Sequence, residues 1–246
     1  MFNTDSQYIV SIITARGGSK GIPRKNIALV AGRPLIDYTI QASLGSHFIT
    51  ETYVTSDSDE ILAVAGQSGA RTIKRPAELA TDTASSESAI LHAIEQIKAE
   101  KGHCPDIFIL LQPTSPLRDS DDIDSAFETF FKTKANALIS GTEPAVNPLK
   151  QMIVSEDGTL KTLTDDPSVP FKARQLLPRA FEPNGAIYII KTELFLKTEL
   201  LIGDRTIPFY MDASKSLDID TPQDLKEAAE LLETLHSLGP KRSSHV

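Results

Sequence analysis

The order of apolar and polar positions along the chain predicts strands that alternate with amphipathic helices. Short, nearly unbroken apolar runs are typical of strands buried on both faces, and apolar positions three and four residues apart are typical of helices. On this basis we expect strands at residues 8–13, 52–55, 71–74, 106–111, 137–140, 183–190 and 207–211. We expect helices at residues 34–44, 59–68, 87–98, 192–200 and 222–238, and a further helix from residue 120. This alternation predicts an α/β fold around a mainly parallel sheet.

The segment from residue 142 to residue 182 departs from this alternation. Apolar runs at residues 150–154 and 160–163 flank Asp157-Gly158, a dipeptide that favours the tight turn of a β-hairpin. Residues 165–179 are then polar, irregular and interrupted by prolines. Long irregular segments in compact domains usually carry function or contact a partner. We therefore expect one domain over residues 1–246, with residues 142–182 as an excursion that makes the contact of a homodimer.

The first strand is followed by a turn that is rich in glycine and in basic side chains. Gly17 and Gly18 permit a sharp bend and a close approach to a ligand. Four basic residues lie in and after this bend: Arg16, Lys20, Arg24 and Lys25. No acidic residue occurs between Asp5 and Asp37, although the formal net charge of the protein is −8. This pattern predicts an anion site at the carboxyl edge of the sheet. A flexible basic surface loop is the alternative, because the turn matches neither the Walker loop nor Gly-x-Gly-x-x-Gly.

Two further stretches carry candidate chemistry. Gln112 follows the strand at residues 106–111 in a proline-rich loop, where its amide could offer a donor and an acceptor to a nucleobase. Residues 216–220 alternate between polar and apolar, so they read as a further strand with both carboxylates, Asp218 and Asp220, on one face. Such a pair suits Mg²⁺ when phosphate oxygens and water complete the coordination. Alternatively, neighbouring amides and lysines such as Lys215 would satisfy these carboxylates.

The composition narrows the class of protein. The chain has 246 residues with 40% hydrophobic content, so it can bury a sizeable core. Its acidic balance argues against nucleic acid and anionic membranes as partners. Cys104 is the single cysteine, which excludes an internal disulfide and fits a reducing cytosol. No apolar run approaches the ~20 residues of a membrane span, so we expect a soluble cytoplasmic protein.

Five separated blocks match one known family, in the family's order and over nearly the whole chain. They are residues 15–20, 75–79, 111–118, 184–188 and 218–221. In these blocks the chain resembles the acylneuraminate cytidylyltransferases, which make CMP-activated sialic acids, as CMP-N-acetylneuraminic acid synthetase does. The resemblance implies a three-layer α/β/α Rossmann-like nucleotidyltransferase fold, CTP and a nonulosonic acid as substrates, and Mg²⁺ as cofactor.

The resemblance also implies a role for each matching side chain. The phosphates and ribose of CTP would be held by Arg16, Ser19, Lys20, Lys25 and Asn26. The cytosine would be read by Arg75, Ser86 and Gln112, and the sugar pocket would be lined by Gln112, Asn184 and Tyr188. Mg²⁺ would be held by Asp218 and Asp220, which with Arg16 and Lys20 form the catalytic set. A sugar carboxylate in the partner subunit would be reached by Lys150 and Arg174.

The implied reaction is attack of the anomeric hydroxyl of the sugar acid on the α-phosphorus of CTP, with release of pyrophosphate. The identity of the sugar acid stays open. Glu182 stands where sialic-acid enzymes often carry an arginine, and pseudaminic or legionaminic acid would fit the pattern too. Enzymes for 3-deoxy-manno-octulosonate typically continue the turn as Leu-Pro-Gly-Lys-Pro, whereas this chain has Ile22-Pro23-Arg24-Lys25-Asn26. A non-catalytic nucleotide-binding regulatory module is the alternative from another class, and the retained acidic pair argues against it.

Overall fold

The computed structural model describes residues 7–19 and 21–238, and their side chains up to residue 235. In this part of the chain a seven-stranded sheet has the order β11-β7-β10-β6-β1-β4-β5. The strands are β1 (Ile9–Thr14), β4 (Glu51–Ser56), β5 (Arg71–Lys74), β6 (Ile107–Leu110), β7 (Ala137–Thr142), β10 (Glu182–Lys191) and β11 (Thr206–Tyr210). Only β10 runs antiparallel to its neighbours, β6 and β7. The expectation of a mainly parallel mixed sheet is confirmed.

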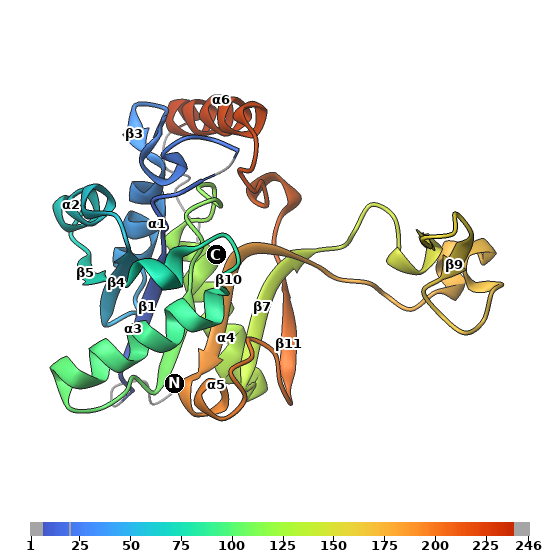
Figure 1. Ribbon diagram of the computed structural model, residues 1–246, viewed down its shortest axis with the longest axis horizontal. Coiled ribbons are helices and arrows are strands. Elements are labelled where there is room, and N and C mark those ends of the chain that lie inside the picture. The colour runs from blue at the N-terminus through green and yellow to red at the C-terminus, as the bar shows by residue number, and fades with distance from the viewer. Residues whose placement is uncertain (1–6, 20, 239–246) are drawn as a thin grey trace, which may run out of the picture.

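Helices cover both faces of the sheet (Figure 1). They are α1 (Leu35–Leu44), α2 (Asp59–Gln67), α3 (Ser86–Lys101), α4 (Ser120–Thr133), α5 (Thr192–Thr198) and α6 (Pro222–Leu238). Side chains of β1 alternate between two cores: Ile9 and Ile13 pack with α1, α2 and α4, whereas Val10 and Ile12 pack with α3 and α5. A third cluster joins α6 to α1 and to the short hairpin of β2 (Leu29–Val30) and β3 (Arg33–Pro34). The three-layer α/β/α arrangement is therefore confirmed.

Helices α2, α3 and α4 begin at polar caps. The hydroxyls of Ser58 and Ser85 accept free backbone N–H groups in the first turns of α2 and α3. Helix α4 begins with a capping box between Asp119 and Asp122. Within residues 7–19 and 21–238, no helix combines the length and apolar content that crossing a bilayer requires.

The stretch at residues 216–220, expected as a strand, has no strand partner. It is extended, and the backbone N–H of Ile219 donates to the carbonyl oxygen of Thr114 at 2.9 Å. Ile219 is fully buried in the cluster under α6, whereas Asp218 and Asp220 are exposed. The alternation therefore reflects one apolar anchor between two outward carboxylates, and a single anchor is too little to form a ladder.

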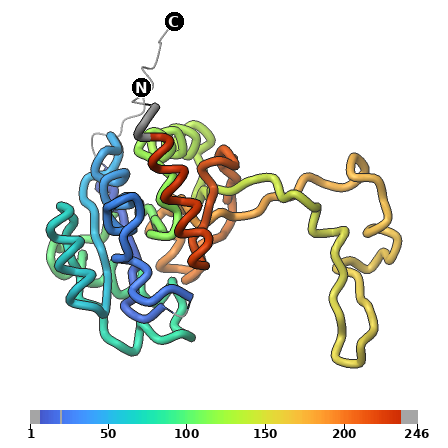
Figure 2. The backbone as a smooth tube through the Cα atoms, turned by 90° about the horizontal axis from the view of Figure 1, so that it is seen from above, coloured from blue at the N-terminus to red at the C-terminus, as the bar shows by residue number. Residues whose placement is uncertain are grey.

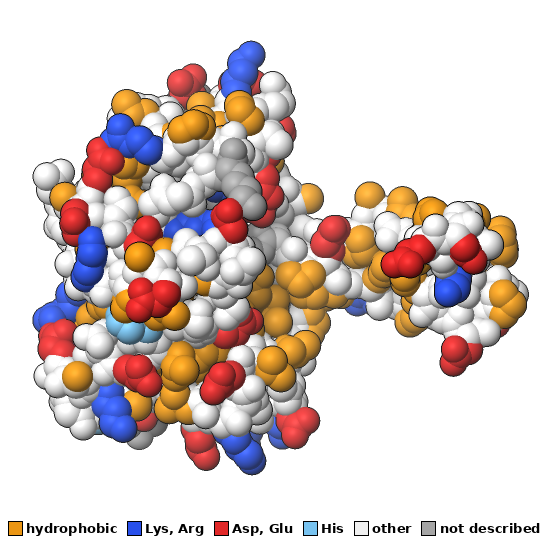
Figure 3. Space-filling view, viewed as in Figure 1, with side chains coloured by type: hydrophobic (Ala, Val, Ile, Leu, Met, Phe, Trp, Pro, Cys, Tyr) orange, Lys and Arg blue, Asp and Glu red, His pale blue; other side chains and the backbone are white. Residues whose placement is uncertain are grey.

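Between β7 and β10 the chain leaves the sheet as a long arm that ends in a small lobe (Figures 1 and 2). The lobe contains the predicted hairpin, formed by β8 (Met152–Val154) and β9 (Leu160–Thr162). Apolar side chains are exposed along the arm and lobe, as Figure 3 shows; they include Val146, Ile153, Val154, Leu160, Leu163, Phe171 and Leu176. Phe171 has 77% of its surface exposed, which is unusual for a phenylalanine in a folded domain.

Candidate active site

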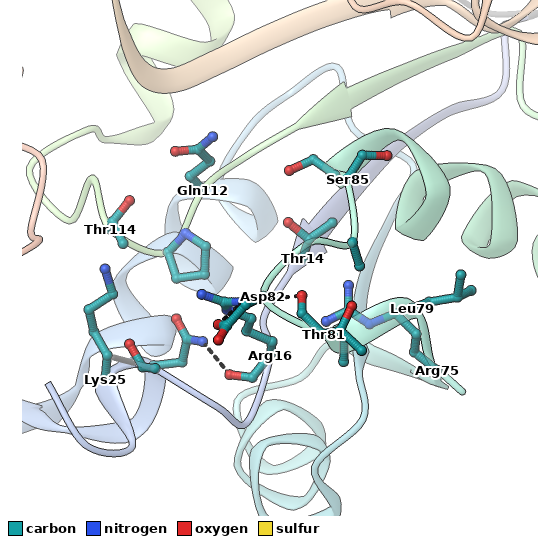
Figure 4. A pocket seen from close by; sticks show the side chains of 16 residues that line it. Thr14, Arg16, Lys25, Arg75, Leu79, Thr81, Asp82, Ser85, Gln112 and Thr114 are labelled. Carbon is teal, nitrogen blue, oxygen red and sulfur yellow. Dashed lines mark hydrogen bonds and ion pairs between the residues drawn. The ribbon is translucent and has the colours of Figure 1, made fainter. Parts of the chain in front are cut away.

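A cavity of about 310 Å³ lies where β1, β5 and β6 end; β4 lies between β1 and β5 and runs parallel to both. Because these strands are parallel and in register, the residues that follow each of them meet at one edge of the sheet. Seven predicted nucleotide-binding residues line the cavity: Arg16, Ser19, Lys25, Asn26, Arg75, Ser86 and Gln112 (Figure 4). Lys20 lies outside the described residues. The structure therefore brings together every described member of the predicted nucleotide set.

The glycine turn after β1 is held in shape from two sides. The backbone N–H of Gly17 donates to the carboxylate of Asp57 at 2.8 Å. The side-chain amide of Asn26 donates to the carbonyl oxygen of Arg16 at 2.9 Å, and Asn26 is buried. Asn26 thus supports the turn from within, while the turn itself presents backbone and basic groups to the cavity.

Two guanidinium groups give the cavity its positive charge. Arg16 forms an ion pair with Asp82 at 3.0 Å and is partly exposed. Arg75 is buried, its nearest carboxylate is Asp57 at 4.0 Å, and its Nε–H has no partner among the described residues. Burial and the nearby charge of Arg16 lower the pKa of Arg75, against the opposite effect of Asp57. A buried donor without an acceptor costs free energy, so an acidic or carbonyl oxygen in the cavity would be bound favourably there.

Gln112 lies against the backbone of β10. A Cβ atom added to Gly185 would stand 2.5 Å from Oε1 of Gln112, so only glycine permits this contact. Gly185 also has a φ of +74°, in the left-handed region that other residues adopt at a cost. The backbone carbonyl oxygen of Gln112 accepts hydrogen bonds from Thr39 and from the buried guanidinium of Arg118. The amide of Gln112 is therefore presented to the cavity from a closely fitted support.

The acidic pair lies beside the basic turn. The ammonium of Lys25 donates to the carbonyl oxygen of Ile219 at 2.8 Å and to the carboxylate of Asp220 at 3.1 Å. A Cβ on Gly21 would stand 2.5 Å from the carbonyl oxygen of Asp220, so the two segments touch. Lys215, named above as a possible partner of this pair, instead binds the caps of α4 at Asp119 (2.5 Å) and Asp122 (2.8 Å).

The chemistry of the acidic pair fits a hard divalent cation. Asp218 is exposed as a residue, but its carboxyl is partly desolvated, which raises its pKa; the charge of Asp220 raises this pKa further, and a hydrogen bond with Thr114 opposes both effects. Asp220 already has a cationic group against it, the Lys25 ammonium. Among the described residues no third His, Cys, Asp or Glu joins them in a metal-binding group. Two carboxylates completed by phosphate oxygens and water match the preference of Mg²⁺.

The predicted sugar-binding residues divide into three groups. Tyr188 pairs in register with Leu110 at the end of β6, and burial followed by the charge of Asp218 raises its pKa. Asn184 is buried, and its amide bonds to protein groups. Lys150 and Arg174 lie in the arm, where they bind the Lys172 carbonyl and the Glu143 carboxylate. The structure thus places Tyr188 near the acidic pair and turns Asn184 inward. Neither Lys150 nor Arg174 lines the cavity, and the arm that carries them extends away from the sheet (Figure 1).

Sequence reasoning missed two residues that shape this site. Asp57 holds the glycine turn and faces Arg75, and Thr114 lines the cavity and is hydrogen-bonded to Asp218. Asp57 directly follows β4, and Thr114 lies in the loop that follows β6, so both are at the carboxyl ends of parallel strands. That position alone could have identified them, because the ends of neighbouring parallel strands converge.

The mixed sheet, covered by helices on both faces and with a cationic cavity at the carboxyl ends of its parallel strands, has the Rossmann-like nucleotidyltransferase fold that the sequence predicts. The fold is shared with a solved structure of CMP-2-keto-3-deoxy-manno-octonic acid synthetase complexed with CTP. That comparison has a TM-score of 0.69 at 16% identity and covers 93% of this chain and 99% of the other.

Sequence comparison gives the family. Residues 10–241 match the family model described as cytidylyltransferase, and the chain belongs to the cytidylyltransferase family. It is 34% identical to an N-acylneuraminate cytidylyltransferase of Escherichia coli, over 89% of this chain and 51% of that protein. It is 33% identical to a pseudaminic acid cytidylyltransferase of Campylobacter jejuni, over 92% of this chain and 96% of that protein. The chain thus spans about half of the first relative and nearly all of the second.

Proposed function

We propose that this protein transfers CMP from CTP to the anomeric hydroxyl of a nonulosonic acid, with Mg²⁺ as cofactor. The contact between Lys25 and Asp220 carries the proposal, because it joins the basic turn to the acidic pair at the mouth of one cavity. A triphosphate in this cavity would lie between the basic groups and the two carboxylates. Binding and positioning of this kind supply most of the catalysis in phosphoryl and nucleotidyl transfer.

The residues present suggest a division of labour. Arg16, Lys25 and the unpaired Nε–H of Arg75 bind phosphate or base oxygens and spread their charge. Mg²⁺ held by Asp218 and Asp220 would supply further charge neutralisation at the phosphates. The sugar hydroxyl forms a bond to the α-phosphorus, the bond to pyrophosphate breaks, and the hydroxyl proton passes to a carboxylate. We assign this last role to the acidic pair, Asp218 and Asp220.

The substrate class rests on the relatives, one of which acts on N-acylneuraminate and another on pseudaminic acid. Legionaminic acid, another nine-carbon keto-sugar acid, belongs to the same class. Glu182 lies at the start of β10, exposed and at the base of the arm, so its negative charge would repel an anionic group placed beside it. We therefore propose the class of nonulosonic acids rather than one member of it.

We also propose that the protein works as a homodimer through its arm. The exposed apolar residues of the arm and lobe form a surface that a second copy of the chain would cover. Lys150 and Arg174 lie on this arm, remote from their own cavity, and would reach the sugar carboxylate in the partner subunit. The proposal accounts for two cations that have no role in the site of their own chain.

The decisive experiment measures pyrophosphate release with CTP, Mg²⁺ and a panel of keto-sugar acids. One or more nonulosonic acids should support turnover, and Asp220→Ala should abolish it while thermal unfolding stays unchanged. Asp121→Ala, which removes an exposed carboxylate at the start of α4, is the matched control and should keep full activity. Tight CTP binding without pyrophosphate release for any sugar acid would favour a regulatory module instead.

A further inference from the structure

The side chain of Asn184 makes all its hydrogen bonds within the protein. Its Oδ1 accepts from the hydroxyl of Ser140 at 2.6 Å and from the backbone N–H of Ala186 at 3.2 Å. Its Nδ2 donates to the hydroxyl of Ser216 at 2.9 Å and to the sulfur of Met211 at 3.4 Å. With 8% of its surface exposed, Asn184 has little capacity left for a sugar.

These bonds lie where β10 loses its regular pairing. The register of β10 against β7 shifts between Pro183 and Tyr188, so backbone groups there lack ladder partners. The hydroxyl of Ser140 accepts a hydrogen bond from the backbone N–H of Ile187 at 2.8 Å and donates one to Asn184. Asn184 also accepts a hydrogen bond from the backbone N–H of Ala186. Asn184 is thus rigidly fixed to the centre of the sheet on one side.

On its other side, Asn184 holds the segment that carries the acidic pair. The hydroxyl of Ser216 accepts a hydrogen bond from Nδ2 of Asn184 and donates one to the carbonyl oxygen of Asp212. Ser216 precedes Asp218 by two residues. Beyond Asp218 the next tie is the bond from Ile219 to Thr114. The bond from Lys25 to the carbonyl oxygen of Ile219 and the hydrogen bond between Thr114 and Asp218 also hold this segment, and its upstream anchor to the sheet passes through Asn184.

We propose that Asn184 is a positioning residue, which fixes Asp218 for metal binding through Ser216 and does not contact the sugar. The inference rests on the proposed function, since it assigns the metal to the acidic pair. It predicts that removal of the Ser216 hydroxyl weakens metal binding although Asn184 remains in place. A sugar-contacting Asn184 would instead leave metal binding unaffected by any change at Ser216.

The test measures Mn²⁺ binding by calorimetry to the full chain with a non-hydrolysable α,β-methylene analogue of CTP. Ser216→Ala should weaken Mn²⁺ binding about fivefold, the usual effect of one lost hydrogen bond. Ser216→Thr keeps the hydroxyl and should restore it. Ser214→Ala is the matched control, because Ser214 binds Asp212 in the same segment but does not touch Asn184.

Kinetics and a double-mutant cycle complete the test. Asn184→Ala should raise the Mg²⁺ concentration for half-maximal rate, leave the KM for the sugar acid within twofold, and show no additive effect with Ser216→Ala. Normal Mn²⁺ binding in Ser216→Ala, or a raised sugar KM as the main effect of Asn184→Ala, would overturn the assignment. If Asn184→Ala does not fold, Mn²⁺ binding by Ser216→Ala alone decides whether the assignment holds. Because Mn²⁺ binding is read without turnover, an inactive wild type would refute the proposed function and leave this measurement intact.

Discussion

Replacing Gly185 by alanine should separate recognition from stability. The new methyl group would stand 2.5 Å from Oε1 of Gln112, well inside van der Waals contact, so the amide of Gln112 must move out of its position. Losing one or two hydrogen bonds to a ligand from that amide corresponds to roughly a 10- to 100-fold decrease in kcat/KM. The substituted residue also keeps a φ of +74°, which costs an alanine about 1–2 kcal/mol.

A matched control separates the two effects. Gly102 has a φ of +84° at the end of α3, but a Cβ there meets no atom within 4 Å. Gly102→Ala should therefore show the same backbone cost, roughly a 2–8 °C lower Tm for a chain of this size, with kcat/KM unchanged. Pyrophosphate release and thermal unfolding of both variants give the comparison.

The steric argument has a further check in the Gln112→Ala background. With the amide already removed, Gly185→Ala should reduce activity no further, because its effect acts through that amide. The reasoning fails if Gly185→Ala is as active as Gly102→Ala, or if the two losses at positions 112 and 185 are additive.

Three other changes follow from the structure. Lys25→Met should weaken CTP binding roughly tenfold or more in calorimetry, because a charge-assisted contact is lost; unchanged affinity would exclude Lys25 from the nucleotide site. Glu51→Gln tests acid stability: burial opposes ionisation, but hydrogen bonds from an ammonium and two tyrosine hydroxyls hold the pKa of Glu51 at about 2. Since that pKa lies below its unfolded value, the stabilisation is present above about pH 4.5 and is lost as pH falls towards 2. Urea unfolding of Glu51→Gln should show a deficit of about 3 kcal/mol at pH 7 that disappears near pH 2; an equal deficit at both pH values would contradict this. The proposed homodimer predicts that the wild type sediments as a dimer and that Phe171→Glu sediments as a monomer; a Phe171→Glu dimer would place the interface elsewhere, and a monomeric wild type would refute the dimer.

Much of the fold could be predicted from the spacing of hydrophobic residues alone, because buried side chains alternate regularly between the two faces of the sheet. Ile9 and Ile13 on one face of β1, with Val10 and Ile12 on the other, are what a doubly covered strand requires. The failure at residues 216–220 has a physical cause. Alternation shows which side chains point outward, but a ladder also needs a neighbouring strand, and only the Ile219 N–H forms such a bond to Thr114.

The site was less predictable where roles depend on distant neighbours. Cationic residues after a buried strand could be assigned to a ligand from charge and topology, and the cavity contains those that the structure describes. The inward orientation of the Asn184 side chain could not be predicted, because it depends on hydrogen bonds to Ser140 and Ser216, which are far away in the sequence. The partner of Lys215 was mistaken for the same reason, since the caps of α4 come close to it only after folding.

The two ends of the arm are paired with each other. Glu182 lies opposite Thr142, and Pro183 opposite Gly141, so the chain leaves and re-enters the sheet on adjacent strands about 5 Å apart. An insertion closed at its base in this way can lengthen, shorten or change sequence without altering the register of the core. The arm is thus a modular element: it can change while the cavity at the sheet edge keeps its lining residues, because none of them lies on the arm.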